Sequence, residues 1–204
     1  MCAGYELAKR DMLVTFGIQP NCAETGYGYF RFHNPINDCQ HPAFHIREFV
    51  EKPDLETAER YLESGSYLWN SGMFLMRASV WLKVIGEFNP EILHACELAF
   101  AAGEYDGLFF RPDQDSFMSS PSDSIDYAVM ERINQSGKYT AAVVPLDTGW
   151  SDIGSWDTVW QARNPDDNGN VMMGDVVTAE TQDSLIISNH RLVQSYISTH
   201  PKQF

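Results

Sequence analysis

The chain has 204 residues, 44% of them hydrophobic, which suffices for one domain with a real core and for the beginning of another. Its net charge of −14 repels nucleic acid and anionic membranes, so neither is an expected partner, although a local Lys or Arg can still bind a phosphorylated ligand. No apolar run approaches the ~18 residues of a membrane span, and no secretory signal is recognisable. The four cysteines form no Cys-x-x-Cys pair, which indicates a reducing, cytoplasmic setting.

Strands and helices alternate from residue 13 to residue 163, which predicts an α/β layer architecture. Residues 69–76 are expected to form a loop followed by a strand, and residues 105–121 to form a loop. The other expected strands are 13–18, 26–32, 43–50 and 139–144. The expected helices are 55–62, with Asp54 as N-cap and Gly65 as its stop, then 79–88, 90–102, one beginning near residue 122 and closing near Gly137, and 155–162.

Turn-forming residues dominate positions 164–170, and short apolar runs follow at 171–173, 176–177 and 184–188. This change of texture predicts a domain boundary between residues 163 and 164. The first domain is expected to cover residues 1–163, and a small β-rich segment residues 164–204.

Glu51 and Lys52 stand at the end of a predicted strand, directly before Pro53. A carboxylate accepts hydrogen bonds from sugar hydroxyls, and an ammonium group meets a phosphate as a point charge. Pro53 predicts an extended backbone at Lys52. The alternative for the pair is a solvated strand end with a surface ion pair.

Gly28 and Asn70 are two further candidates. Gly28 lies between two tyrosines, and its missing side chain lets the backbone approach a ligand closely, although bulges and turns use glycine equally often. The amide of Asn70 offers a donor and an acceptor to vicinal hydroxyls, and the neighbouring Trp69 offers an apolar wall. The alternative for Asn70 is an Asx turn that leads into a strand.

Asp152 is the candidate metal ligand, in the stretch Trp150-Ser151-Asp152-Ile153-Gly154-Ser155-Trp156. Mg²⁺ is often held by one or two carboxylates together with waters and substrate phosphates. The alternative is that Asp152 caps the following helix. Asp126, near the start of a predicted helix, is expected to serve the helix dipole.

The phrases LVTFGIQP, ETGYGYF, FVEKP, YLWNSGMF, SIDYAVME, DTGWSDIGSW and GNVMMGDV occur in the order typical of one family. Over residues 12–193 the chain resembles bacterial mannose-1-phosphate guanylyltransferases of the long type, which often also carry mannose-6-phosphate isomerase activity. The resemblance implies a Rossmann-like α/β nucleotidyltransferase domain with a mixed sheet, followed by the start of a β-helix-like segment.

By the same resemblance, Gly28, Glu51, Lys52 and Asn70 would contact mannose 1-phosphate or the sugar of GDP-mannose, and Asp152 would bind Mg²⁺. The family reaction joins mannose 1-phosphate to GTP, giving GDP-mannose and releasing pyrophosphate. No residue of this chain is assigned a catalytic role.

The family's glycine-rich triphosphate loop, a second metal-binding Asp and the isomerase domain have no counterpart in this sequence. The expectation is therefore a truncated form that is inactive alone, with open sheet edges that favour a homo-oligomer or pairing with a full-length homologue. The alternative is a non-catalytic module that binds GDP-mannose or a sugar phosphate for regulation.

Overall fold

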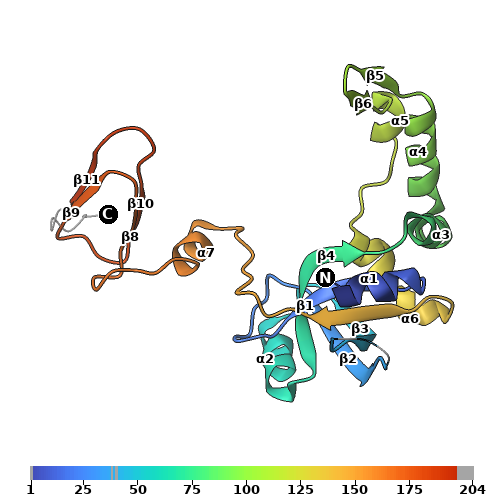
Figure 1. The fold of residues 1–204 in the computed structure, drawn as a ribbon, viewed down its shortest axis with the longest axis horizontal. Helices are drawn as coiled ribbons and strands as arrows, with labels where there is room; N and C mark the ends of the chain where they lie inside the picture. Colours follow the sequence, from blue (N-terminus) through green and yellow to red (C-terminus); the bar gives the residue numbers. More distant parts are fainter. Residues whose placement is uncertain (1, 38, 40, 197–204) are drawn as a thin grey trace. The chain divides into compact units, whose positions relative to one another are not determined.

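The computed structural model describes residues 2–37, 39 and 41–196 (Figure 1). The chain forms two compact units, residues 1–148 and residues 149–204. Residues 149–163 group with the second unit by spatial proximity, whereas the sequence assigns them to the first domain. The domain boundary between residues 163 and 164 stays a prediction.

Five strands of the first unit close into a ring in the order β1, β4, β2, β3 and β7. Their bounds are β1 (Leu13–Ile18), β2 (Tyr29–Pro35), β3 (Phe44–Val50), β4 (Tyr67–Leu75) and β7 (Ala141–Pro145). The β1–β7 pair is parallel and the other four pairs are antiparallel, so the predicted mixed sheet of an α/β fold is confirmed. The expectation of open edges in this sheet is wrong, because each of the five strands pairs on both sides.

The core lies on both faces of this ring because β1 is buried along its whole length. Successive side chains of a strand point to opposite faces, and the neighbours Leu13 and Val14 accordingly belong to different apolar clusters. One cluster packs α3 (Ala78–Phe88), the π-helix η1 (Asp126–Met130) and α6 (Ile133–Ser136) against the strands. The other includes α1 (Cys2–Lys9), a helix that the sequence pattern did not reveal.

Helix α2 (Leu55–Ser64) confirms the predicted caps. The Asp54 carboxylate accepts a hydrogen bond from the Thr57 N–H at 2.8 Å. Gly65 ends the helix in the left-handed conformation, with a φ of 62°, and its N–H donates to the Leu62 carbonyl.

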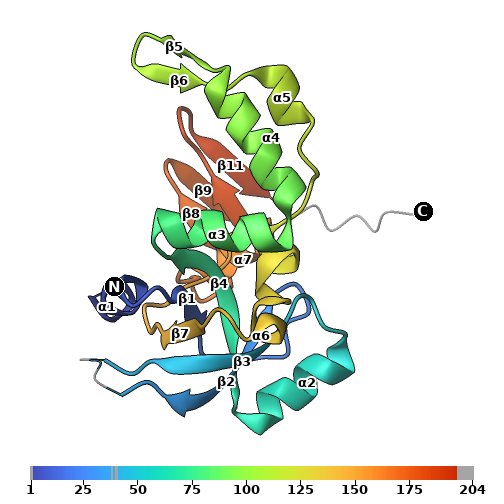
Figure 2. The same cartoon turned by 90° about the vertical axis from the view of Figure 1, so that its right-hand side faces the viewer.

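Residues 105–121 are not a simple loop. They include most of a hairpin of β5 (Glu104–Asp106) and β6 (Phe109–Arg111), and the short helix α5 (Gln114–Met118). Helix α4 (Pro90–Ala101) carries these elements away from the five-stranded ring, as both views show (Figures 1 and 2). Asp113 caps α5, because its carboxylate accepts hydrogen bonds from the N–H and the hydroxyl of Ser116. The surrounding turn-forming residues make this cap difficult to recognise in the sequence.

The second unit begins with helix α7 (Trp156–Gln161) and continues with short strands. Strand β8 (Val171–Met173) pairs in parallel with β10 (Leu185–Ile187), and β9 (Val176–Ala179) pairs in parallel with β11 (Val193–Tyr196). Parallel pairing of strands that are close in sequence is typical of a chain that coils in successive turns, as in a β-helix. The pairing therefore agrees with the predicted β-helix-like segment. The buried Asn170 ties this coil together, since its amide donates to the Thr181 carbonyl and accepts from the Ser184 N–H.

Ser155 is the N-cap of α7, and it forms a capping box with Thr158. Ser155→Ala removes the hydroxyl that accepts from the Thr158 N–H at 3.2 Å. We expect the second unit to lose about 1 kcal/mol of stability in urea unfolding. Ser155→Thr keeps the hydroxyl and serves as the control, and equal losses in both variants would contradict the capping role.

No helix among the described residues is both long and apolar enough to cross a membrane.

Candidate functional site

The chain turns sharply where β3 ends, at Glu51 and Lys52. Lys52 adopts a left-handed backbone with a φ of 48°, so the extended conformation predicted from Pro53 is wrong. Such a conformation costs a non-glycine residue on the order of 1–3 kcal/mol and is often found at functional sites. It is held by the Lys52 N–H, which donates to the Tyr27 carbonyl at 3.2 Å. The turn brings the Lys52 Nζ to 3.7 Å from Glu51 Oε1.

The two charges of this pair differ in exposure. The Lys52 side chain is 61% exposed, whereas the Glu51 side chain is only 12% exposed. The alternative of a solvated strand end therefore describes Lys52 but does not describe Glu51. The result is a shielded acceptor beside a cation that solvent can reach.

Gly28 makes room for the shielded carboxylate. A Cβ atom at this position would lie 2.5 Å from Glu51 Oε2 and 2.7 Å from a ring carbon of Phe49. The Gly28 carbonyl also accepts a hydrogen bond from the Asn70 N–H at 2.7 Å. Gly28, Glu51, Lys52 and Asn70, which the sequence singled out separately, are thus neighbours in the structure.

Asn70 lies within β4, not in the predicted loop, and pairs with Gly17 directly before a β-bulge. Gly72 has a φ of 70°, and the Ser71 hydroxyl donates to the Phe16 carbonyl at 2.6 Å, so the strand continues past the irregularity. The Gly72 N–H donates to Asn70 Oδ1 at 3.0 Å, which is the contact of the alternative Asx-turn interpretation. The Asn70 amide therefore makes a local contact to the Gly72 N–H next to the irregularity of β4.

Asp126 joins the cluster from the π-helix η1, and the sequence did not predict this. Its Oδ1 accepts a hydrogen bond from Asn70 Nδ2 at 2.9 Å. Burial raises the pKa of the Asp126 carboxyl, and the charge of Glu131 adds to this effect. The hydrogen bond from Asn70 and the charge of Lys52 lower the same pKa. Burial is also the largest cause that raises the pKa of Glu51. The nearby charges of Asp126 and Glu131 raise this pKa further, whereas Lys52 lowers it.

Aromatic rings border the cluster. The ring of Tyr27 meets the ring of Trp69 edge to face, with the centroids 5.2 Å apart. The Trp69 side chain is buried, with 6% of the residue exposed. Its indole N–H has no hydrogen-bond acceptor among the described residues. Half-buried carboxylates, an amide and an exposed ammonium suit a ligand that carries hydroxyls at one end and negative charge at the other.

Asp152 belongs to the second unit and is exposed in the segment before α7. The alternative that it caps this helix is wrong, because Ser155 is the N-cap. The described residues contain no group of three or more His, Cys, Asp or Glu side chains arranged to hold a metal ion. A single exposed carboxylate fits Mg²⁺ only where ligand phosphates and waters complete the coordination shell.

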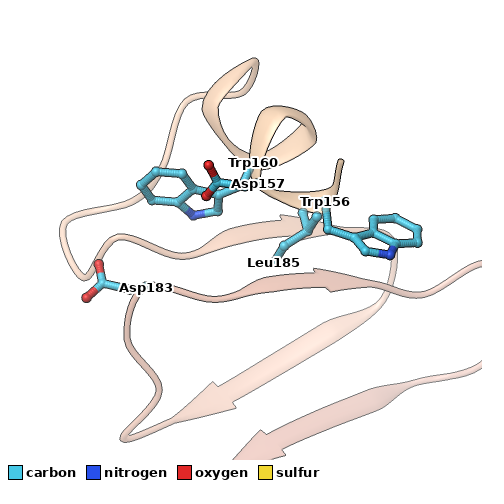
Figure 3. A pocket seen from close by; sticks show the side chains of 5 residues that line it. All are labelled: Trp156, Asp157, Trp160, Asp183 and Leu185. Atoms are coloured by element: carbon cyan, nitrogen blue, oxygen red, sulfur yellow. The ribbon is translucent and has the colours of Figure 1, made fainter. Parts of the chain in front are cut away.

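An open pocket of about 330 Å³ lies within the second unit and is lined by Trp156, Asp157, Trp160, Asp183 and Leu185. In Figure 3 the Trp156 ring points away from the Trp160 ring, so the two indoles do not form one wall. The Trp160 indole N–H donates to the Gly169 carbonyl at 2.8 Å. None of the residues predicted to bind a sugar phosphate lines this pocket.

The raised pKa of Glu51 has a consequence for stability. A carboxyl whose folded pKa lies above its unfolded value binds more protons in the folded state, so stability falls as pH rises through that window. Glu51→Gln removes this dependence, and we expect it to raise the melting temperature at pH 7 but not below pH 4. Thermal melts of both proteins across pH 3–8 check this, with Glu59→Gln as the exposed-carboxylate control. Parallel pH curves for wild type and Glu51→Gln would contradict it.

A closed mixed sheet, with carboxylate, amide and ammonium groups gathered at one strand end, defines an α/β domain suited to a polar ligand. Residues 1–169 match the nucleotidyl transferase family, and the chain belongs to that family.

Three relatives are 46–50% identical to this chain, and two of them have the same name. The chain is 50% identical over 175 residues to a mannose-1-phosphate guanylyltransferase of Salmonella montevideo, covering 84% of this chain and 36% of the relative. It is 46% identical over 187 residues to the Escherichia coli (strain K12) protein of the same name, covering 91% and 38%. It is also 48% identical over 177 residues to the xanthan biosynthesis protein XanB of Xanthomonas campestris pv. campestris (strain B100), covering 87% and 36%. The chain thus spans well under half the length of these curated relatives.

Two solved structures share the fold. One is described as a mannose-1-phosphate geranyltransferase from Thermus thermophilus, with a TM-score of 0.76 and 25% identity, over 95% of this chain and 53% of that one. The other is described as a mannose-6-phosphate isomerase from Helicobacter pylori, with a TM-score of 0.61 and 31% identity, over 73% and 55%. The predicted nucleotidyltransferase fold is therefore confirmed.

Proposed function

We propose that this chain forms the sugar-phosphate-binding part of a mannose-1-phosphate guanylyltransferase. Family membership and identities of 46–50% to proteins of that name support the proposal. The observation that carries it is the cluster at the end of β3, where a shielded Glu51 stands beside an exposed Lys52. In this pair, Glu51 is suited to bind hydroxyls and Lys52 is suited to bind a phosphate, and the two side chains lie close together.

Each residue takes a distinct part in the proposed site. Glu51 accepts hydrogen bonds from sugar hydroxyls, and Asn70 can both donate to and accept from a hydroxyl pair. Lys52 attracts the phosphate and neutralises part of its charge. Gly28 has no side chain and therefore leaves room for the Glu51 carboxylate. Holding mannose 1-phosphate in this way would orient its phosphate oxygen for attack on the α-phosphorus of GTP, with loss of pyrophosphate.

Asp152 is proposed to hold Mg²⁺ together with substrate phosphates. The ion, when bound, would supply charge neutralisation for the phosphoryl groups. GTP as co-substrate, a cytoplasmic location and association with itself or a full-length homologue belong to the same proposal. Because the net charge is −14, both anionic substrates need local cations, and Lys52 and Mg²⁺ are the cations proposed here.

Titration calorimetry with mannose 1-phosphate, mannose and inorganic phosphate tests the proposal. Because hydroxyls and phosphate are recognised by different groups, we expect mannose 1-phosphate to bind more tightly than either fragment alone. Equal affinity for mannose 1-phosphate and inorganic phosphate would reduce the site to an anion-binding surface. Absence of any binding of mannose 1-phosphate would contradict the proposed function.

A further inference from the structure

The Asn70 amide is fixed at both of its ends by this chain. Its Nδ2 donates to Asp126 Oδ1 at 2.9 Å, and its Oδ1 accepts from the Gly72 N–H at 3.0 Å. An amide has two N–H donors and two carbonyl lone pairs, so one donor and one acceptor stay free for a ligand. The Asp126 contact also decides which end of the amide is the nitrogen, because a carboxylate only accepts when ionised.

Asp126 itself is firmly held. It begins the π-helix η1, whose next turn places Ala128, Val129 and Met130 in the core. The Ala128 N–H donates to the Ser124 carbonyl at 2.8 Å, and the Glu131 N–H donates to the Asp126 carbonyl at 3.0 Å. π-helical turns are rare and frequently occur at functional sites, and η1 carries the Asp126 side chain. Here that side chain reaches a residue 56 positions earlier in the chain.

The charged groups around Asp126 come from two segments, and a third segment supplies its neutral partner. Glu51 and Lys52 follow β3, Glu131 follows η1, and Asn70 on β4 is the neutral partner. Burial raises the pKa of both Asp126 and Glu51, and the Asp126 charge raises the pKa of Glu51 further. Asp126 therefore influences the site through its hydrogen bond to Asn70 and through its charge on Glu51.

We propose that Asp126 is a positioning and specificity-determining residue, which locks the Asn70 amide so that its free donor and acceptor match one configuration of vicinal sugar hydroxyls. This inference rests on the proposed function, because it assigns the sugar side of the same site. A freely rotating amide fits several hydroxyl configurations, whereas a locked amide discriminates between epimers. Asp126 then acts on affinity and specificity through Asn70, acts on the pH dependence of binding through Glu51, and does not contact the ligand.

A double-mutant cycle tests the inference by calorimetry with mannose 1-phosphate and its epimer glucose 1-phosphate. We expect Asp126→Ala to weaken mannose 1-phosphate binding roughly tenfold and to narrow the ratio between the two sugars. In an Asn70→Ala background the same change should have no further effect, since the two residues act as one unit. Asp126→Asn keeps an acceptor for Asn70 Nδ2 and should restore most of the affinity.

The pH profile supplies a readout that a purely structural role would not move. Removing the Asp126 charge lowers the pKa of Glu51, so the loss of binding on acidification should shift to lower pH in Asp126→Asn. A loss of affinity in Asp126→Ala that persists undiminished in the Asn70→Ala background would overturn the inference. So would a lowered melting temperature with unchanged affinity and epimer ratio.

Failure of the inference is distinguishable from failure of the proposed function. Wild-type protein that binds neither sugar phosphate overturns the proposed function, and the ligand-directed part of the inference with it. Binding by the wild type that is insensitive to Asp126 overturns the inference alone. Hydrogen exchange of the Asn70 side-chain amide, followed by NMR without ligand, should be slow in the wild type and faster in Asp126→Ala. Equal exchange rates would show that Asp126 does not lock the amide.

Discussion

Gly28→Ala is expected to destabilise the first unit by about 1–3 kcal/mol and to abolish measurable binding of mannose 1-phosphate. A Cβ atom would overlap Glu51 Oε2 at 2.5 Å and two Phe49 ring carbons at 2.7 and 2.8 Å. The Phe49 ring packs in the core against Phe30, so it cannot move freely, and the carboxylate must leave its place. Urea unfolding and calorimetry measure the two effects.

Gly26→Ala is the matched control, because it adds the same methyl group in the same loop. Its Cβ would meet only the far end of the Glu24 side chain, at 3.2 Å, and its backbone needs no left-handed conformation. We expect wild-type affinity and a stability change of less than about 0.5 kcal/mol. Similar behaviour of the two alanine variants would show that the space at Gly28 does not matter to the site.

Lys52→Ala is expected to weaken binding of mannose 1-phosphate by one to two decades. The loss of a charge-assisted hydrogen bond costs roughly 1.5–3 kcal/mol, and each 1.4 kcal/mol corresponds to about a factor of ten. Lys52 is the cation next to Glu51 and is 61% exposed, so a phosphate can reach it. Calorimetry at two salt concentrations measures the loss and its electrostatic character.

Lys9→Ala provides the matched control for Lys52→Ala. Lys9 also pairs with a glutamate, Glu6, at 3.5 Å, and its side chain is 55% exposed. The two variants change the net charge equally, so a general electrostatic effect would appear in both. An affinity in Lys52→Ala equal to that of Lys9→Ala would remove Lys52 from the site.

Much of the fold follows from local sequence chemistry. The apolar run of β1 and the caps Asp54 and Gly65 of α2 are confirmed, because each depends on residues close in sequence. The structure of residues 69–76 and 105–121 is harder to predict from local sequence. Ser71 and Gly72 suggest a loop, yet the Ser71 hydroxyl bonds to the Phe16 carbonyl on the neighbouring strand and the strand continues.

The candidate site was predictable in composition but not in geometry. The sequence named Gly28, Glu51, Lys52 and Asn70, and the structure brings these four together. The left-handed backbone of Lys52 was missed, because the local effect of Pro53 is outweighed by the bond to the Tyr27 carbonyl. The contact of Asp126 with Asn70 is not predictable from sequence, because it joins residues 56 positions apart and starts from a π-helical turn that no local pattern reveals.

A crystal structure of the chain with mannose 1-phosphate tests the central claim most directly, since it shows where each end of the ligand lies. The account predicts sugar hydroxyls within hydrogen-bond distance of the Glu51 carboxylate and the Asn70 amide, and the phosphate beside the Lys52 ammonium. A ligand bound elsewhere, or one whose phosphate lies away from Lys52, would contradict the account.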